Sequence, residues 1–234
     1  LAIGHSLRFW GAFLTCRQLV AEGAIGTPVS GSIDRMGRAG LRRVGEGAPS
    51  DHWRNDPRNT GGQALEGFIH ELDFARAIFG EVASVRCEIA GGQEYEGLLS
   101  PKILQALVRF ESGALVTART GSTVALPSRG LWIAGTEGAL HFSGWGDSVS
   151  HYRHDSETPE QIPAREGYAY HRELGDLLKA ISTGKEPENS GINGMKNVAL
   201  GLGMYRSFEM GLRIDYRDGL PVDMAGDYQN LQWW

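Results

Sequence analysis

Several stretches of the chain carry apolar side chains at every third or fourth position, the spacing that places them on one face of a helix. The clearest stretch spans residues 61–79, and its apolar positions are Leu65, Phe68, Ile69, Leu72, Ala75 and Phe79. An earlier helix is expected to end at Gly23, and later helices are expected at about 168–183 and 191–210. Glycine follows each of these helices, and it tolerates the left-handed backbone that ends many helices.

Between residues 82 and 154 the pattern changes to an alternation of apolar and polar positions, which is typical of strands with one buried face. Ser112-Gly113 interrupts the alternation between residues 104 and 120, and Thr136-Glu137-Gly138 interrupts it between residues 131 and 142. Turn residues between two alternating runs predict a β-hairpin at each place. Shorter strands are expected in residues 1–10, ahead of the first helix, and in residues 26–33.

A strand and a helix, then a block of antiparallel strands, then further helices predict an α+β fold. We expect a single domain over residues 1–234, with one large, mostly antiparallel, open-faced sheet that has helices on one face. Residues 37–60 show no period, so they are predicted to be a long loop, and long loops in compact domains often carry function. Residues 143–165 are polar and rich in turn residues, and residues 215–234 are polar with an aromatic end.

The composition narrows the classes of partner and the location. The 234 residues carry a net charge of −5 and no basic block, which argues against a nucleic-acid partner. No apolar run approaches the roughly 18 residues that would span a bilayer, so no membrane association is expected. Cys16 and Cys87 lie far apart in apolar segments, and we expect two buried thiols in a reducing compartment. A cytoplasmic protein is therefore predicted.

Three side chains of the helix at 61–79 form the candidate for chemistry. Glu66, His70 and Asp73 follow at i, i+4 and i+7, so on a continuous helix they would share one face beside the apolar stripe. An imidazole next to a carboxylate suits a general base or acid. Two alternatives stay open: His70 bonds Glu66 on a solvated helix face, or the three side chains bind a metal ion.

A glycine-rich phosphate-binding sequence would indicate that the chain itself binds a nucleotide. A dinucleotide-binding unit needs Gly-x-Gly-x-x-Gly between a strand and a helix. Gly201-Leu-Gly203 is followed by Met-Tyr-Arg within a predicted helix, and Gly144-Trp-Gly146 lies in a polar stretch. Neither fits this context, so this chain alone is not expected to hold NAD or NADP.

The helix at 61–79 contains a segment that resembles a motif of the Gfo/Idh/MocA oxidoreductases, Gly-Gly-x-x-x-Asp-x-Gly-x-His-x-x-Asp, in their second domain. The segment here reads Gly61-Gly62-Gln-Ala-Leu-Glu66-Gly67-Phe-Ile-His70-Glu-Leu-Asp73, with Gly67 one residue ahead of the motif's later glycine. Other segments resemble the family in the same order along the chain, namely residues 4–9, 19–29, 53–57 and 173–187. The resemblance covers nearly the whole chain, and it implies the C-terminal, substrate-binding domain. The NAD(P)-binding Rossmann domain of the family is expected upstream of Leu1.

The resemblance implies that the complete enzyme oxidises a sugar or polyol hydroxyl, or catalyses the reverse reduction, with NAD or NADP as the hydride carrier. His70 stands at the position of the family's proton acceptor, and Glu66 stands where the family usually carries aspartate. Contact with the substrate is expected from Arg8, Trp53, Arg54, Asp73, Tyr168 and His171. Arginine offers a fork of donors to oxygen atoms, and indole offers a flat apolar face to a sugar ring.

The resemblance also implies a homo-oligomer that pairs through the open face of the sheet. An uncovered sheet face with alternating Leu, Val, Ile and Trp would expose a large apolar patch, which favours such pairing. Two other functions remain open at this point. One is a non-catalytic scaffold of the same fold, and the other is a metal-dependent hydrolase or isomerase that uses Glu66, His70 and Asp73.

Overall fold

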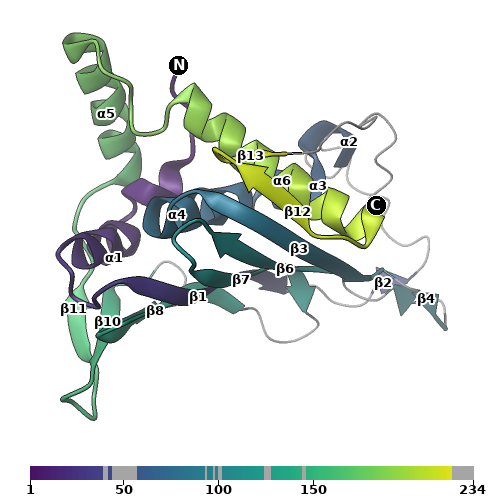
Figure 1. Ribbon diagram of the computed structural model, residues 1–234, viewed down its shortest axis with the longest axis horizontal. Coiled ribbons are helices and arrows are strands. Elements are labelled where there is room, and N and C mark those ends of the chain that lie inside the picture. The colour runs from purple at the N-terminus through teal and green to yellow at the C-terminus, as the bar shows by residue number, and fades with distance from the viewer. Residues whose placement is uncertain are drawn as a thin grey trace.

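A computed structural model describes residues 1–38, 42–43, 57–92, 94–96, 98–99, 102–123, 128–143 and 146–222 of the chain. Its main body is a ten-stranded sheet with helices on one face, as Figure 1 shows. The α+β class and the open-faced sheet with helices on one face are thereby confirmed.

The ten-stranded sheet is mostly antiparallel. Its strands, in spatial order, are β11 (Glu160–Pro163), β10 (Ser148–Arg153), β9 (Gly138–Phe142), β8 (Ser128–Gly135), β1 (Pro28–Arg38), β7 (Leu115–Thr123), β6 (Lys102–Phe110), β3 (Val82–Gly91), β12 (Ile214–Arg217) and β13 (Leu220–Pro221). Only β1 and β7 pair in parallel among these described strands. A small second sheet contains β2 (Arg42–Arg43), β5 (Leu98–Leu99) and β4 (Glu94–Tyr95).

Both predicted hairpins are present, because β6 pairs with β7 and β8 pairs with β9, each across the expected turn. The strand expected in residues 26–33 is longer than predicted and becomes β1 at the centre of the sheet. Strands β10 and β11 arise from residues 143–165, and only β10 falls within the alternating region that was expected to end at residue 154. They lie at one edge of the sheet, and the described part of β11 has no fully buried residue, so a hydrophobic pattern could not reveal it.

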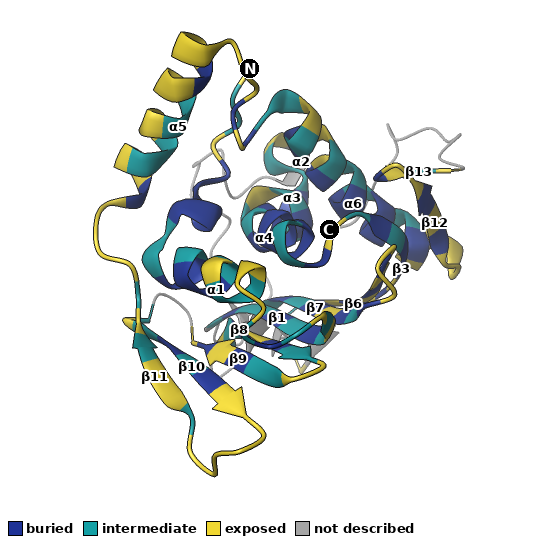
Figure 2. Cartoon of the chain, turned by 60° about the vertical axis from the view of Figure 1, so that its left-hand side comes forward, coloured by how far each residue is buried: buried dark blue, intermediate teal, exposed yellow. Residues whose placement is uncertain are grey.

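The helices are η1 (Ser6–Phe9, a 3-10 turn), α1 (Gly11–Ala21), α2 (Pro57–Thr60), α3 (Gly62–Glu66), α4 (Ile69–Phe79), α5 (Ala169–Thr183) and α6 (Gly191–Met210). The helices α1, α4 and α6 lie over one face of the sheet, whereas α5 stands apart from them, as Figures 1 and 2 both show. The strand predicted within residues 1–10 is wrong. That segment makes one bridge, from Ala2 to Ser190, and then turns into η1, whose four residues are all buried.

Aromatic rings form the contact between the helices and the sheet. Phe13 of α1 meets Phe74 of α4 and Phe142 of β9 edge to face, with ring centroids 4.7 and 4.8 Å apart. Edge-to-face pairs of this kind add to the free energy gained from burial alone. Because Phe74 and Phe142 are almost completely buried, they hold α4 firmly over the sheet, and α4 carries His70.

The helix expected over residues 61–79 is interrupted, so the prediction of one continuous helix is wrong. Helix α3 ends at Glu66, Gly67 and Phe68 form a turn, and α4 begins at Ile69. The backbone N–H of Phe68 bonds the carbonyl of Gln63, five residues back, and that of Glu71 bonds the carbonyl of Phe68, three residues back. This change of spacing breaks the regular four-residue ladder, so side chains on either side of Gly67 no longer follow one helical face.

The Gly-Gly pair that opens the motif has a conformational reason. Gly61 and Gly62 have φ angles of 70° and 74°, in the left-handed region. Two consecutive residues with positive φ are strained for any residue with a Cβ atom, and glycine adopts them without penalty. The pair therefore turns the chain from α2 into α3 and places α3 next to α6.

The uncovered face of the sheet is mostly polar, so the predicted large apolar patch is wrong for the described residues. The exposed apolar side chains in the central strands are Leu107 of β6 and Trp132 of β8, at 48% and 41% exposure. Their neighbours across the strands are polar, because Trp132 pairs with Ser32 and His141, and Leu107 pairs with Thr117. More of the exposed apolar side chains lie on the helices α5 and α6.

Helix α5 carries one apolar stripe that faces away from the body of the domain (Figure 2). Its members Tyr170, Leu174, Leu178 and Ile181 are 50%, 54%, 58% and 71% exposed. Their spacing of three and four residues places them on the same side of the helix. A row of exposed apolar side chains of this kind is typical of a surface that binds further polypeptide.

Candidate functional site

His70 lies in the first turn of α4, directly after the break between α3 and α4. Its imidazole is half-buried and meets the ring of His5 edge to face, with 5.6 Å between the ring centroids. His5 is buried and comes from the residue just ahead of η1. Segments far apart in sequence thus bring two imidazoles together in a partly dry place, which suits the transfer of protons near neutral pH.

The carboxylate of Asp73, three residues after His70, is completely buried. Arg8 of η1 donates to both of its oxygens, from Nε to Oδ2 at 2.7 Å and from Nη2 to Oδ1 at 2.5 Å. This two-pronged contact matches the planar guanidinium group to the carboxylate. The pair fixes η1, with His5 in front of it, against the helix that carries His70.

Two asparagines of α6 complete the set of donors around Asp73. Their Nδ2 atoms donate to Oδ1 of Asp73, from Asn193 at 2.7 Å and from Asn197 at 2.6 Å. Asn197 turns its own Oδ1 toward Nη1 of Arg76 at 2.6 Å, and arginine can only donate, so the orientation of the amide is fixed. Its Nδ2 lies 3.0 Å from Nδ1 of His5, which therefore accepts, and the neutral His5 ring carries its proton on Nε2.

This network keeps Asp73 ionised. Burial pushes the pKa of Asp73 upward, but the hydrogen bonds from Arg8 and Asn197 and the charge of Arg8 outweigh it and hold that pKa well below its ordinary value. The sequence predicted Arg8 and Asp73 as substrate contacts, whereas in the structure they bind each other and are only 5% and 0% exposed. Their position makes them anchors for the two elements that carry His5 and His70.

A second ion pair lies next to His70, on the side of the sheet. Glu71 is buried, and Arg35 of β1 donates from Nη1 to both of its oxygens, at 3.0 and 3.1 Å. Burial raises the pKa of Glu71 to about 7, against the opposing charge and hydrogen bond of Arg35. A cavity of about 20 Å³ adjoins Glu71, and it is lined also by Asp34 and Arg129.

We expect Glu71 to make the stability of the fold depend on pH between about 4.5 and about 7. Its pKa is higher in the folded state than in the unfolded chain, so the folded state binds more protons in this range. The stabilising contribution is complete below the ordinary pKa and is lost as the pH rises through the folded-state value. Urea unfolding at a series of pH values measures this, and Glu71→Gln should flatten the dependence. Equal slopes for the two proteins would contradict the expectation.

The predicted common face of Glu66, His70 and Asp73 does not form. Glu66 is exposed, His70 is half-buried and Asp73 is fully buried, because the helical register breaks at Gly67. Within the described ranges, no group of three or more His, Cys, Asp or Glu side chains is arranged to hold a metal ion. The geometry therefore does not favour a metal-dependent hydrolase or isomerase built on these three side chains.

The remaining predicted substrate contacts have different outcomes. Tyr168 and His171 lie at the start of α5, where both are exposed and their rings meet at 5.1 Å. Trp53 and Arg54 lie outside the described residues. For all four of these residues, contact with a substrate stays a prediction.

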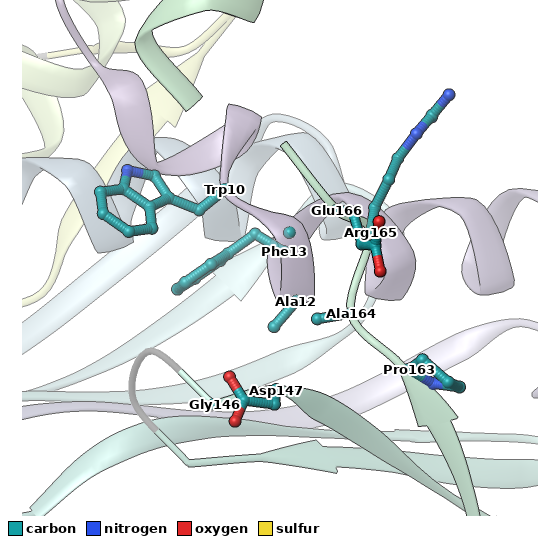
Figure 3. A pocket seen from close by; sticks show the side chains of 10 residues that line it. Trp10, Ala12, Phe13, Gly146, Asp147, Pro163, Ala164, Arg165 and Glu166 are labelled. Atoms are coloured by element: carbon teal, nitrogen blue, oxygen red, sulfur yellow. The ribbon is translucent and has the colours of Figure 1, made fainter. Parts of the chain in front are cut away.

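A hollow of about 400 Å³ opens at the N-terminal end of α1 (Figure 3). Its lining residues are Trp10, Gly11, Ala12, Phe13, Gly146, Asp147, Pro163, Ala164, Arg165 and Glu166. Trp10 and Phe13 point to the same side in Figure 3, and Asp147 lies across from the first residues of the helix. The acidic side chain of Asp147 complements the partial positive charge at the start of α1. His70 is not among the residues that line this hollow.

The glycines that could suggest a nucleotide loop serve helix packing. A side chain on Gly201 would collide with Leu65 of α3, and one on Gly203 would collide with Tyr216 of β12. Both glycines lie inside α6, so their backbone N–H groups belong to the helix and do not face a phosphate. Gly201 and Gly203 therefore do not fit a dinucleotide.

Sequence reasoning missed His5, Glu71, Asn193 and Asn197. The two asparagines are four residues apart on α6, and this spacing of polar side chains on one helix face is a signal for a buried polar contact. His5 lies three residues before Arg8 in an otherwise apolar segment, which is a similar signal. In chemical terms the completed site offers a half-buried imidazole beside a buried, hydrogen-bonded Arg8–Asp73 pair, a suitable arrangement for moving a hydroxyl proton.

Comparison with known proteins agrees with this geometry. The family model of the GFO/IDH/MocA C-terminal domain matches residues 13–141. The chain is 24% identical over 230 residues to the 1,5-anhydro-D-fructose reductase of Ensifer adhaerens, a match that covers 94% of this chain and 65% of that protein. It is 28% identical over 140 residues to the 2,7-anhydro-N-acetylneuraminate hydratase of Escherichia coli K12, which covers 58% of this chain and 36% of that protein.

Solved structures share the fold. Levoglucosan dehydrogenase, in a complex with NADH and L-sorbose, superposes with a TM-score of 0.74 and 18% identity, over 91% of this chain and 65% of that one. The aldose-aldose oxidoreductase of Caulobacter crescentus, in a complex with glycerol, gives a TM-score of 0.75 and 22% identity, over 92% and 64%.

The chain thus spans less than two thirds of the length of these relatives. Among the described residues, no helix combines the length and the hydrophobicity that crossing a membrane would require. The half-buried histidine of the Gly-Gly-x-x-x-Glu-Gly-x-x-His-x-x-Asp segment, the open-faced sheet and the match of the family model lead to one conclusion: the chain belongs to the Gfo/Idh/MocA family, as its C-terminal domain.

Proposed function

We propose that this chain is the substrate-binding and oligomerisation part of an NAD(P)-dependent oxidoreductase that acts on a sugar or polyol hydroxyl. The observation that carries the proposal is the placement of His70, half-buried beside His5 and anchored through the buried Arg8–Asp73 pair. In the oxidation direction His70 accepts the proton of the hydroxyl group, and in the reduction direction it returns a proton to the carbonyl oxygen. The fixed ring keeps the accepting nitrogen in place, and positioned proton transfer is sensitive to such placement.

The relatives support the class of substrate. The anhydrofructose reductase and the levoglucosan dehydrogenase are both named for sugar derivatives. Around His70 we propose further contacts with the sugar from Glu66, Trp53, Arg54, Tyr168 and His171. Glutamate at position 66 is one methylene longer than the aspartate usual in the family, so it would reach a hydroxyl group farther from the helix.

The hydride carrier is proposed to be NAD or NADP, bound by a nucleotide-binding domain joined to this one. When bound, the nicotinamide supplies the hydride chemistry, and this chain supplies the proton acceptor and the orientation of the substrate. The apolar stripe on α5, formed by Tyr170, Leu174, Leu178 and Ile181, supports packing against further polypeptide. The free, buried thiols of Cys16 and Cys87 support a reducing, cytoplasmic location.

The test is turnover of a panel of sugars and polyols by the oxidoreductase that contains this domain, with NAD and NADP in parallel. The panel includes 1,5-anhydro-D-fructose for reduction and levoglucosan for oxidation. A change in the absorbance of reduced nicotinamide with at least one member supports the proposal. A folded protein that converts no member with either dinucleotide would overturn it and favour a non-catalytic scaffold of the same fold.

We further propose a homo-oligomer that pairs through the open face of the sheet. The face is polar around Trp132 and Leu107, and a mixture of apolar centres and polar surroundings is typical of interfaces between stable subunits. Light scattering after size exclusion is expected to give a particle of at least two chains, and Trp132→Glu should shift it toward one chain. A single chain of 25.5 kDa in the unmodified protein would contradict this.

A further inference from the structure

The start of α4 lacks the side-chain cap that most helices have. Its N-cap residue is Phe68, whose side chain cannot accept a hydrogen bond and is completely buried. The N–H groups of His70 and Glu71 bond instead the carbonyls of Gly67 and Phe68, at 3.5 and 3.1 Å, so the first turn depends on the short segment that precedes it. His70 lies in this first turn, so something else must hold it in place.

Arg35 of β1 contacts the chain on both sides of His70. Before it, Gly67 presents its bare α-carbon to the guanidinium group, and a Cβ atom there would lie 3.3 Å from Nε and 3.5 Å from Cζ of Arg35. After it, Nη1 of Arg35 bonds both oxygens of Glu71. One side chain from the sheet thereby contacts both Gly67, which precedes His70, and Glu71, which follows it.

The positions around the helix show why this bridge matters. Successive residues of an α-helix are rotated by about 100°. Glu71 and Asp73 therefore leave the helix on opposite sides of His70, and each is held by an arginine from another element, Arg35 from β1 and Arg8 from η1. The two pairs oppose rotation of α4 about its axis, and they hold the imidazole between them.

We propose that Arg35 is a positioning residue for His70, tethering the first turn of α4 to β1 through its contact with Gly67 and its ion pair with Glu71. The negative charge of Glu71 in the first turn also suits the positive end of the helix. This inference rests on the proposed function, in which His70 moves the proton. The tether itself is a property of the fold and can be measured without turnover.

The first experiment is amide hydrogen exchange of this chain, followed at Glu71 and Leu72, whose N–H groups bond the carbonyl of Phe68 at 3.1 and 3.0 Å. In Arg35→Met, protection at these amides should fall about fivefold, because the first turn loses its ion pair with β1 and opens more readily. Arg35→Lys keeps the charge near Glu71 but not the flat contact with Gly67, so its loss should be smaller. Because lysine preserves the ion pair, this variant keeps the test valid if Arg35→Met fails to fold.

The second experiment is turnover in the oxidoreductase that contains the domain. Arg35→Met should lower kcat about tenfold with KM unchanged, because a misplaced base affects the transition state more than binding. The matched control is Arg153→Met, which removes an exposed arginine that pairs with Asp155 at the edge of the sheet. It should change neither exchange at Glu71 nor kcat.

The outcomes separate this inference from the proposed function. Unchanged exchange in Arg35→Met overturns the tether, whatever the activity of the enzyme. A loss of protection with an unchanged kcat overturns the positioning role. If His70→Ala retains full turnover, the proposed function fails, and the exchange results at Glu71 and Leu72 still decide whether the tether exists.

Discussion

Replacing His70 by alanine is expected to lower the turnover of the oxidoreductase about a hundredfold or more, the range in which a lost general base is felt. The reason is local: the imidazole is half-buried beside His5, and an alanine would leave a gap that water fills without a fixed geometry. The loss should appear in kcat with the best substrate of the panel, measured by the absorbance of reduced nicotinamide. Binding of the sugar should change less than kcat, because the histidine acts on the reacting proton.

The control for this result is His154→Ala, which removes an exposed histidine that follows strand β10. It should keep full turnover, so a loss in both variants would point to damage of the fold rather than of the chemistry. Hydrogen exchange at α4 in His70→Ala checks the same point. Full turnover in His70→Ala would mean that another group accepts the proton, and His5, whose ring lies 5.6 Å away, would be examined next.

The fold was predictable where the signal was local. The hairpins of β6 with β7 and β8 with β9 follow from alternation around a turn, and α5 and α6 follow from a helical period that ends at glycine. All of these elements depend on neighbours within a few residues in sequence. Strand β11 could not be predicted in this way, because an edge strand with exposed side chains has no hydrophobic pattern.

The candidate site was only partly predictable, and the reason is the range of its contacts. His70 is recognised from the sequence, since the Gly-Gly pair and the histidine form a compact motif. The break at Gly67 is not, and Arg35, which packs against Gly67, comes from a strand more than thirty residues earlier. Because of this break, Glu66 and Asp73 do not share the expected helix face. Glu66 is exposed, whereas Asp73 is buried.

The same argument applies to the partners of Asp73. Its position three residues after His70 gave it the expected role of a substrate contact, whereas the structure places Arg8 and Asn197 around it, from opposite ends of the chain. A one-dimensional pattern shows which side chains share a helix face, but not which other element covers that face. Charged side chains in the interior are therefore the residues whose roles a sequence assigns least well.

Asp73→Ala is expected to destabilise the folded chain by about 3–5 kcal/mol, the usual effect of removing one partner of a buried ion pair. The carboxylate is 0% exposed, and its loss would leave Arg8, at 5% exposure, with only the longer contact to Glu188 at 3.4 Å. Asn193 and Asn197 would lose the acceptor for their amide groups as well. Because domains of this size are stable by only about 5–15 kcal/mol, the effect should be evident as a lower urea midpoint at pH 7.

The comparison variant is Asp155→Ala, which removes an exposed carboxylate that also binds an arginine through two bonds, Arg153. Solvent screens this pair, so the urea midpoint should stay unchanged. In a double-mutant cycle, adding Arg8→Met to Asp73→Ala should lower the free energy of unfolding much less than Arg8→Met does alone. The single variant leaves the buried carboxylate of Asp73 without Arg8, whereas in the Asp73→Ala background this carboxylate is already absent. If the two single variants at Asp73 and Asp155 shifted the midpoint equally, Asp73 would not be the buried anchor that the site requires. His5 and His70 would then owe their placement to apolar packing alone, with Phe68 and Phe74 as the side chains that hold α4 in position.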